Sequence, residues 1–243
     1  MQFVILTALG VGGATMLGAV LGFCLQPLLR RYEATVLGFG GGVMLGSTVW
    51  GLVAPALSYG GKYAVFITVL GVFLGALSLI VLPRYLPSVE AANAACREAG
   101  HVLLLVPAIA LHNLPEGIAA GVGFATENMG AALFIAGGIA LQNLPEGMVI
   151  IAPLLAAGTS RKKALLIACL TGVLEVIGVL IGYASALSIG VLLPLSLAFA
   201  AGCMLLVICR EVVPEMQGGE AKNAPVLALL SGFCLMLAFA ALL

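Results

Sequence analysis

The feature that most limits the fold of this chain is a series of apolar runs, each long enough to cross a bilayer. A spanning helix needs about 20 mainly apolar residues, and glycine, proline or polar residues separate the runs. The runs lie at residues 3–25, 34–58, 62–82, 102–125, 129–152, 163–187, 189–209 and 224–242. Barrel strands would be about ten residues long and would alternate in polarity. We therefore predict an all-α polytopic membrane protein, with eight transmembrane helices in a single domain over residues 1–243.

Composition excludes the other broad classes. Hydrophobic residues make up 63% of the chain and charged residues 8%, whereas soluble domains are about half apolar and about a quarter charged. A globule of this size could not hide so much apolar surface from water. The solvent is therefore expected to be a lipid bilayer, and we expect no nucleic acid as a partner.

The basic residues predict the orientation of the chain. Nine of the ten lie in alternate connections or beside them, namely Arg30, Arg31, Arg84, Arg97, Arg161, Lys162, Lys163, Arg210 and Lys222. Only Lys62 lies on the opposite side. Because basic residues mark the cytoplasmic side, we predict a cytoplasmic loop at 83–100 and extracytoplasmic N- and C-termini, in a bacterial-type plasma (inner) membrane.

Four ionisable residues fall near the middle of predicted spans: His112, Glu116, Glu146 and Glu175. A charge at the bilayer centre costs at least about 2.5–3.5 kcal/mol, and no Lys or Arg lies at the same depth. The glutamates are therefore either protonated and hydrogen-bonded between helices, or they hold cations.

These residues lie in a repeated octet. Residues 110–117 read ALHNLPEG and residues 140–147 read ALQNLPEG, a difference at one position. Consecutive spans are antiparallel, so the repeat suggests an approximate two-fold axis in the membrane plane. On the first helix the i,i+4 and i,i+3 spacings group His112, Asn113 and Glu116. On the second helix the same spacings group Gln142, Asn143 and Glu146.

The octets offer the ligands of a divalent metal. Imidazole nitrogen with carboxylate and amide oxygens suits first-row divalent ions better than alkali ions, and the thiolates of a closed zinc site are absent from the octets. Pro115 and Pro145 displace the carbonyls of Leu111 and Leu141, which adds oxygen ligands if the helices break there. We expect a transported metal, no cofactor and no catalytic residue.

The octets resemble the paired signatures of the ZIP (Zrt/Irt-like) metal transporters. HNLPEG at 112–117 is similar to the signature on the fourth helix of that family, and QNLPEG at 142–147 is similar to its GufA-like branch. Glu175, in TGVLEVIG at 171–178, falls where that branch has a further metal-binding glutamate. GFGGGVMLG at 38–46 and AAGCMLLVICREVVPE at 200–215 also resemble the branch.

The resemblance implies uptake of Zn²⁺, or of Cd²⁺, Fe²⁺ or Mn²⁺, toward the cytoplasm. It implies a 3+2+3 helix arrangement, an elevator-like movement of the metal-bearing helices and, since dimers are known in the family, a homodimer as a candidate assembly. It also implies two adjacent metal positions. The first would use His112, Glu116, Gln142 and Glu146, and the second Asn113, Glu116, Asn143, Glu146 and Glu175.

Some positions depart from the family pattern. Asn143 stands where some GufA-like relatives carry Asp, so two divalent ions would bring four positive charges against three glutamates. We therefore predict that one metal dominates. Met44 is a candidate soft ligand on the access path. Glu211 matches a glutamate at the inner end of the seventh helix, but Arg210 replaces a frequent histidine there.

Three other functions fit the sequence less well. A proton-coupled carrier of a small organic solute would use Glu146 and Glu175 as proton relays. An intramembrane zinc protease would need a second histidine, as in HExxH, which neither octet has. A purely structural protein would leave the buried glutamates without a role. The leading prediction is a divalent metal carrier rather than an enzyme.

Overall fold

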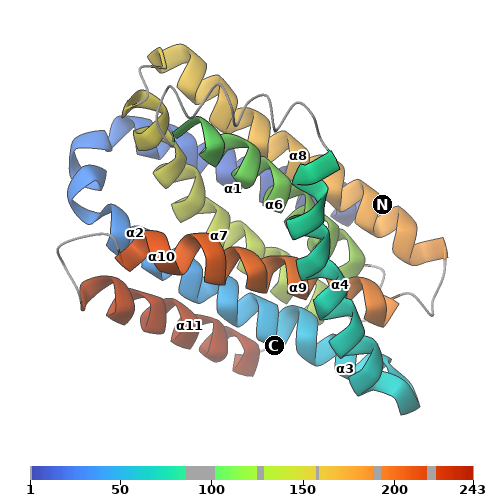
Figure 1. Ribbon diagram of the computed structural model, residues 1–243. Coiled ribbons are helices and arrows are strands. Elements are labelled where there is room, and N and C mark those ends of the chain that lie inside the picture. Colours follow the sequence, from blue (N-terminus) through green and yellow to red (C-terminus); the bar gives the residue numbers. More distant parts are fainter. Residues whose placement is uncertain are drawn as a thin grey trace.

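The computed structural model describes residues 2–85, 102–124, 129–156, 159–188, 193–217 and 223–242, and these ranges contain no strand. They form a bundle of helices (Figure 1). The α-helices are α1 (Gln2–Cys24), α2 (Gln26–Gly46), α3 (Ala54–Tyr59), α4 (Ala64–Tyr85), α6 (Val102–Gly123), α7 (Met129–Ala156), α8 (Arg161–Ser188), α9 (Leu193–Val207), α10 (Val213–Gln217) and α11 (Ala224–Leu242). Two π-helical segments, η1 (Ser47–Val53) and η4 (Ile208–Val212), join α2 to α3 and α9 to α10, and a 3-10 turn, η2 (Gly61–Tyr63), precedes α4.

The prediction of an all-helical membrane protein is confirmed at this level. Within the described ranges, six helical segments are long and apolar enough to cross a bilayer: Gln2–Cys24, Arg31–Tyr59, Gly61–Val81, Arg161–Ser185, Leu193–Gln217 and Ala224–Leu242. The two helices that carry the octets, α6 and α7, contain 22 and 28 residues. Each predicted run thus contains a helix over the residues that the structure describes.

Three boundaries differ from those predicted. α2 begins at Gln26 rather than near residue 34 because Pro27, at the first turn, favours the start of a helix. α4 continues to Tyr85, so the first residues of the predicted 83–100 loop are helical. Residues 86–100 of that loop lie outside the described residues. The helix that contains α9 continues through η4 and α10 to Gln217.

Pro115 and Pro145 do not break their helices, as α6 and α7 are continuous through both positions. Each proline removes one helical hydrogen bond, but close neighbours can hold such a helix together. A methyl group added at Gly40 of α2 would lie 3.1 Å from Cβ of Pro145, so the Pro145 ring fills the space beside this glycine. The octets thus lie on intact helices.

Glycines bring the helices together in parallel pairs. A methyl group at Gly117 of α6 would collide with the carbonyl oxygen of Glu175, and one at Gly121 with that of Val179. Both registers advance by four residues in the same direction, so α6 and α8 are parallel and touch through their backbones. The same register relates α1 to α7, α2 to α11 and α4 to α9.

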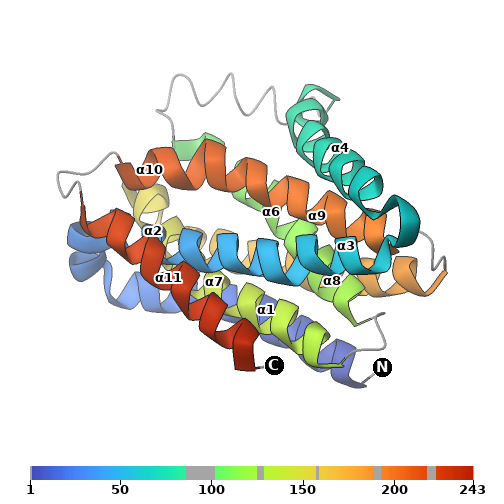
Figure 2. The ribbon, with the colours of Figure 1, turned by 90° about the horizontal axis from the view of Figure 1, so that it is seen from below.

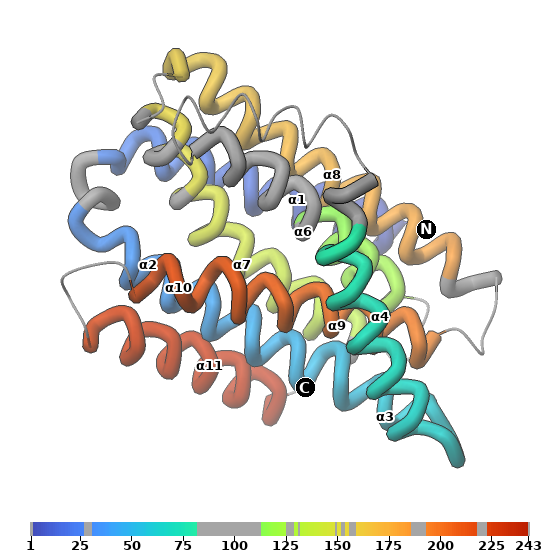
Figure 3. The backbone as a smooth tube through the Cα atoms, in the orientation of Figure 1, coloured from blue at the N-terminus to red at the C-terminus, as the bar shows by residue number. Residues whose placement is uncertain are grey.

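These pairs assemble into two halves. One half contains α1, α6, α7 and α8, because α1 and α6 both pack against α8 as well as against α7. The other contains α2, α4, α9 and α11, linked by η1 and α3. We call them the octet half and the second half. In Figure 2, α4 lies along the outer side of α9, and Figure 3 shows α7 passing through the middle of the bundle, where it contacts α2.

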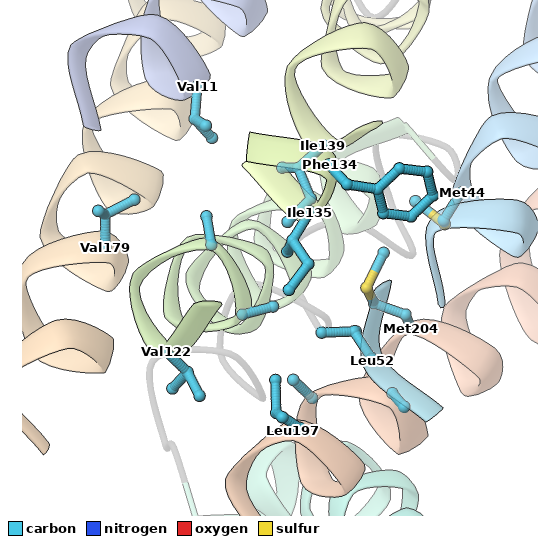
Figure 4. Close-up of a cluster of buried hydrophobic side chains, with 14 of the residues drawn as sticks. Val11, Met44, Leu52, Val122, Phe134, Ile135, Ile139, Val179, Leu197 and Met204 are labelled. Carbon is cyan, nitrogen blue, oxygen red and sulfur yellow. The ribbon is translucent and has the colours of Figure 1, made fainter. Parts of the chain in front are cut away.

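A large apolar cluster lies where the halves meet (Figure 4). Ile135 and Ile139 of α7 lie between Val11 and Val179 of the octet half and side chains of the second half that include Leu52, Leu197 and Met204. The start of α1 and the end of α11 lie toward the same end of the bundle (Figures 1 and 2). Ile135 and Ile139 lie on that side of the octets, because they precede the α7 octet and α7 runs parallel to α1.

The glycine contacts predict that the effect of a Gly→Ala substitution on stability depends strongly on its position. Gly42→Ala should lower the free energy of unfolding by about 1–3 kcal/mol, since its methyl group would overlap the backbone carbonyl of Leu229 in α11. Gly10→Ala, which meets nothing within 4 Å, is the matched control and should not destabilise the protein. Thermal unfolding in detergent measures both, and equal melting temperatures would contradict the role given to these contacts.

Candidate metal site

The two octets bring their polar side chains together inside the octet half. Asn113 and Asn143 are fully buried, and Glu116 and Gln142 are each 1% exposed. Glu175, from α8, is also fully buried. The tight contact of α6 with α8 explains its position, because the backbone of Glu175 lies against Gly117, next to Glu116. Three helices therefore contribute side chains to one polar centre.

Glu175 is held by three hydrogen-bond donors. The Thr15 hydroxyl of α1 and the Asn113 side-chain amide of α6 both donate to Glu175 Oε1, each at 2.6 Å. The Asn143 side-chain amide of α7 donates to Oε2 at 2.6 Å. Each donor comes from a different helix, so this one carboxyl group connects α1, α6, α7 and α8.

Gln142 makes a second connection in the centre. Its amide nitrogen donates to Glu116 Oε1 at 2.8 Å. Its amide oxygen accepts a hydrogen bond of 3.0 Å from the hydroxyl of Ser47, at the start of η1. One oxygen of Glu116 is therefore satisfied by an amide of the neighbouring octet.

Several buried oxygens of the centre have no hydrogen-bond partner among the residues that the structure describes. They are Asn113 Oδ1, Asn143 Oδ1 and Glu116 Oε2. An unsatisfied buried acceptor costs about 1–3 kcal/mol, so three of them in one centre call for an explanation. A cation is the ligand that would satisfy carbonyl and carboxylate oxygens together.

Three carboxyl groups lie close to one another in the centre. The carboxyl group of Glu116 interacts electrostatically with those of Glu146 and Glu175, and Glu146 and Glu175 also interact with each other. The only Lys and Arg residues of α6, α7 and α8 are at 161–163, about 18 Å along the α8 axis from Glu175. These three helices therefore supply no countercharge close to the carboxylates.

The centre is not a finished metal cluster. Within the described ranges, no three His, Cys, Asp or Glu side chains form a group that could hold a metal ion. Glu116 and Glu175 are instead bonded to amide groups. A metal that used Glu116 Oε1 or the Gln142 amide as a ligand would therefore have to replace the hydrogen bond between them.

The remaining predicted residues are placed as follows. His112 lies in α6 one turn before Glu116, and its side chain lies outside the described part of the structure. Glu146 is half-buried in α7, one turn after Gln142. Met44 is buried in α2 within the large apolar cluster. Glu211 lies in η4 of the second half, on a different helix from the octets.

Sequence reasoning missed Thr15 and Ser47. Both are short hydroxyl side chains in apolar runs, and such residues usually bond to carbonyls of their own helix. Ser47 does so as well, because it is also 3.0 Å from the carbonyl oxygen of Met44. Nothing in the sequence indicates that either residue reaches another helix.

Comparison with known proteins gives consistent matches. The family profile of the ZIP zinc transporters matches residues 87–240. The zinc transporter GufA of Myxococcus xanthus is 36% identical over 246 residues, which covers 96% of each chain. ZupT of Shigella dysenteriae, also named a zinc transporter, is 31% identical over 96% of this chain and 93% of its own. ZIPB of Bordetella bronchiseptica is 32% identical over 56% of this chain and 44% of its own.

The hydrogen bonds of Glu175 predict a structural effect that needs no metal. Glu175→Ala should destabilise the metal-free protein by at least about 2 kcal/mol, because three buried donors lose their acceptor. Glu215→Ala, at an exposed glutamate of α10, is the matched control and should change little. Unfolding in the presence of a chelator measures both variants. Equal stability of the two variants would show that Glu175 does not hold these helices together.

Proposed function

Because the chain belongs to the ZIP family of zinc transporters, we propose that it carries Zn²⁺ across the membrane, toward the cytoplasm, through the polar centre between α6 and α7. The observation behind this proposal is that buried oxygens of Asn113, Asn143 and Glu116 have no hydrogen-bond partner within the described part of the chain. They lie beside three glutamates, and the helices that carry these glutamates supply no nearby basic residue. A divalent cation supplies both a partner for these oxygens and a positive charge for the glutamates.

The main ligands in this proposal come from the octets. Glu116 and Glu146 supply carboxylates, His112 an imidazole nitrogen and Gln142 an amide oxygen, once Gln142 has left Glu116. These ligands also accept Cd²⁺, Fe²⁺ and Mn²⁺, so related metals are candidate substrates. Met44 would supply a thioether on the access path, and Glu211 a carboxylate near the exit.

We propose that one metal dominates. The second position would need Glu175 as a ligand, and both of its oxygens already accept hydrogen bonds from Thr15, Asn113 and Asn143. Asn143 also brings no charge where an aspartate would. In the metal-free protein Glu175 therefore acts as the acceptor that positions the two asparagines.

The proposed topology has eight spans in a 3+2+3 arrangement. The helix pairs support this topology. If every long helix crosses the membrane once, the two members of each pair are an even number of spans apart: α1 and α7, α6 and α8, α2 and α11, and α4 and α9. They should then be parallel, as the glycine registers indicate. The common end of the two termini also agrees with an even number of spans.

With the basic residues in the cytoplasm, this common end faces away from it, in a bacterial-type plasma membrane. The part of the large apolar cluster around Ile135 and Ile139 then lies between the polar centre and the extracytoplasmic side. Metal would enter when the octet half moves relative to the second half, which agrees with an elevator-like cycle. A homodimer is the assembly that we propose. The proton-coupled carriage of an organic solute is disfavoured by family membership.

Transport is tested in cells. A host that lacks its own zinc uptake should regain growth at low zinc when it produces this chain. Glu116→Ala should abolish the rescue because it removes a proposed metal ligand. Zinc accumulation, measured with the radioactive isotope, should follow growth. Glu215→Ala is the control that should retain rescue. A correctly inserted wild-type protein that gives no zinc accumulation would contradict the proposal.

Stoichiometry is tested in detergent. The wild type should bind one Zn²⁺ tightly, whereas Asn143→Asp should bind a second with at least about tenfold higher affinity than the wild type does. A restored carboxylate adds a charge-assisted ligand. Calorimetric titration with Zn²⁺ or Cd²⁺ measures both proteins. Binding of two ions with equal affinity by the wild type would contradict the one-metal proposal.

A further inference from the structure

The hydrogen bond from Ser47 to Gln142 crosses from the second half to the octet half. The bonds of two other buried hydroxyls stay within one half: Thr15 bonds to Glu175, and Thr48 of η1 bonds to Met204 and to its own helix. The crossing bond ends on an octet residue that itself bonds to Glu116. It therefore connects the relative position of the halves with the proposed metal site.

Ser47 has one hydroxyl proton and two acceptors. Met44 O and Gln142 Oε1 both lie 3.0 Å from its oxygen. A serine hydroxyl donates to one acceptor at a time. The Met44 carbonyl does not depend on it, because Thr48 also donates to that carbonyl at 2.7 Å. Ser47 can therefore release Gln142 and still keep a hydrogen bond.

Gln142 is oriented away from metal binding while this bond exists. Its oxygen accepts from Ser47, and its NH₂ group donates to Glu116. An amide NH₂ has no lone pair to offer a metal, so Gln142 can act as a ligand only through its oxygen, which points to Ser47 and uses one of its two lone pairs there. The NH₂ group also covers one oxygen of Glu116.

The local packing makes this contact close. Ser47 is 2% exposed and begins the π-helical segment η1. A methyl group at Gly138 of α7 would lie 2.9 Å from Cβ of Ser47, so the helices can approach because residue 138 has no side chain. Gln142 follows one turn later, within reach of the hydroxyl. π-helical segments often occur at functional sites.

We propose that Ser47 is a positioning residue that holds the metal-free site closed. When Gln142 becomes a metal ligand, its NH₂ group leaves Glu116 and its oxygen turns from Ser47 to the metal. The Ser47 proton then returns to Met44 O, and the hydrogen bond between the halves is lost. Metal occupancy thereby favours separation of the octet half from η1. This inference rests on the proposed metal site.

The test compares Ser47→Ala with Ser78→Ala. Ser78 of α4 bonds to the carbonyl three residues earlier, as Ser47 does, but its other contact, Cys203, is in the second half. Ser47→Ala should lower the Kd for Zn²⁺ by about 2- to 10-fold, the range that one neutral hydrogen bond represents. In uptake measurements, KM should fall as well. Ser78→Ala should leave both constants unchanged.

The outcomes separate the two proposals. A Kd in Ser47→Ala that equals or exceeds that of the wild type overturns the inference, because a residue with a merely structural role would not strengthen binding when removed. The same tightening in Ser78→Ala also overturns it. If Ser47→Ala does not fold, Ser47→Cys, with its weaker donor, should give a smaller decrease in Kd, and an unchanged value there counts equally against the inference. Binding that survives Glu116→Ala would instead overturn the proposed site.

Discussion

A carboxyl group removed from water needs either a cation or hydrogen-bond donors, and this requirement organises the centre of the protein. Glu175 takes its donors from Thr15, Asn113 and Asn143, so four helices meet at one side chain. Both asparagines direct their NH₂ groups to Glu175, and their carbonyl oxygens have no partner among the described residues. The hydrogen bonds to Glu175 thus orient the two asparagines so that their oxygens are available to a metal.

The two kinds of helix contact differ in what they permit. Within each parallel pair, glycines let backbones touch, as Gly117 and Gly121 do against α8, and no side chain can rearrange there. Between the halves the contacts use side chains, such as the stacked rings of Phe134 and Phe239, 5.6 Å apart. Side chains can change partners, so relative movement should occur between the halves and not within the pairs.

The helical, membrane-spanning character was predictable because apolar runs and their length depend on local sequence alone. The octets identified Asn113, Glu116, Gln142 and Asn143 as neighbours because helical spacing fixes which side chains share a face. Unbroken helices at Pro115 and Pro145 were not predictable, since packing against residues such as Gly40 overrides the local effect of proline. The bonds of Thr15 and Ser47 depend on which helices pair, and a single sequence does not contain that information.

The connection of three helices through Glu175 has a consequence for the part of the cycle that carries no cargo. A carrier that has released its metal must return with an empty site, and a centre held together only by the ion would lose its geometry at that moment. Here Thr15 and the two asparagines hold α1, α6, α7 and α8 together without metal. The unloaded protein can therefore return with these four helices still held in one arrangement.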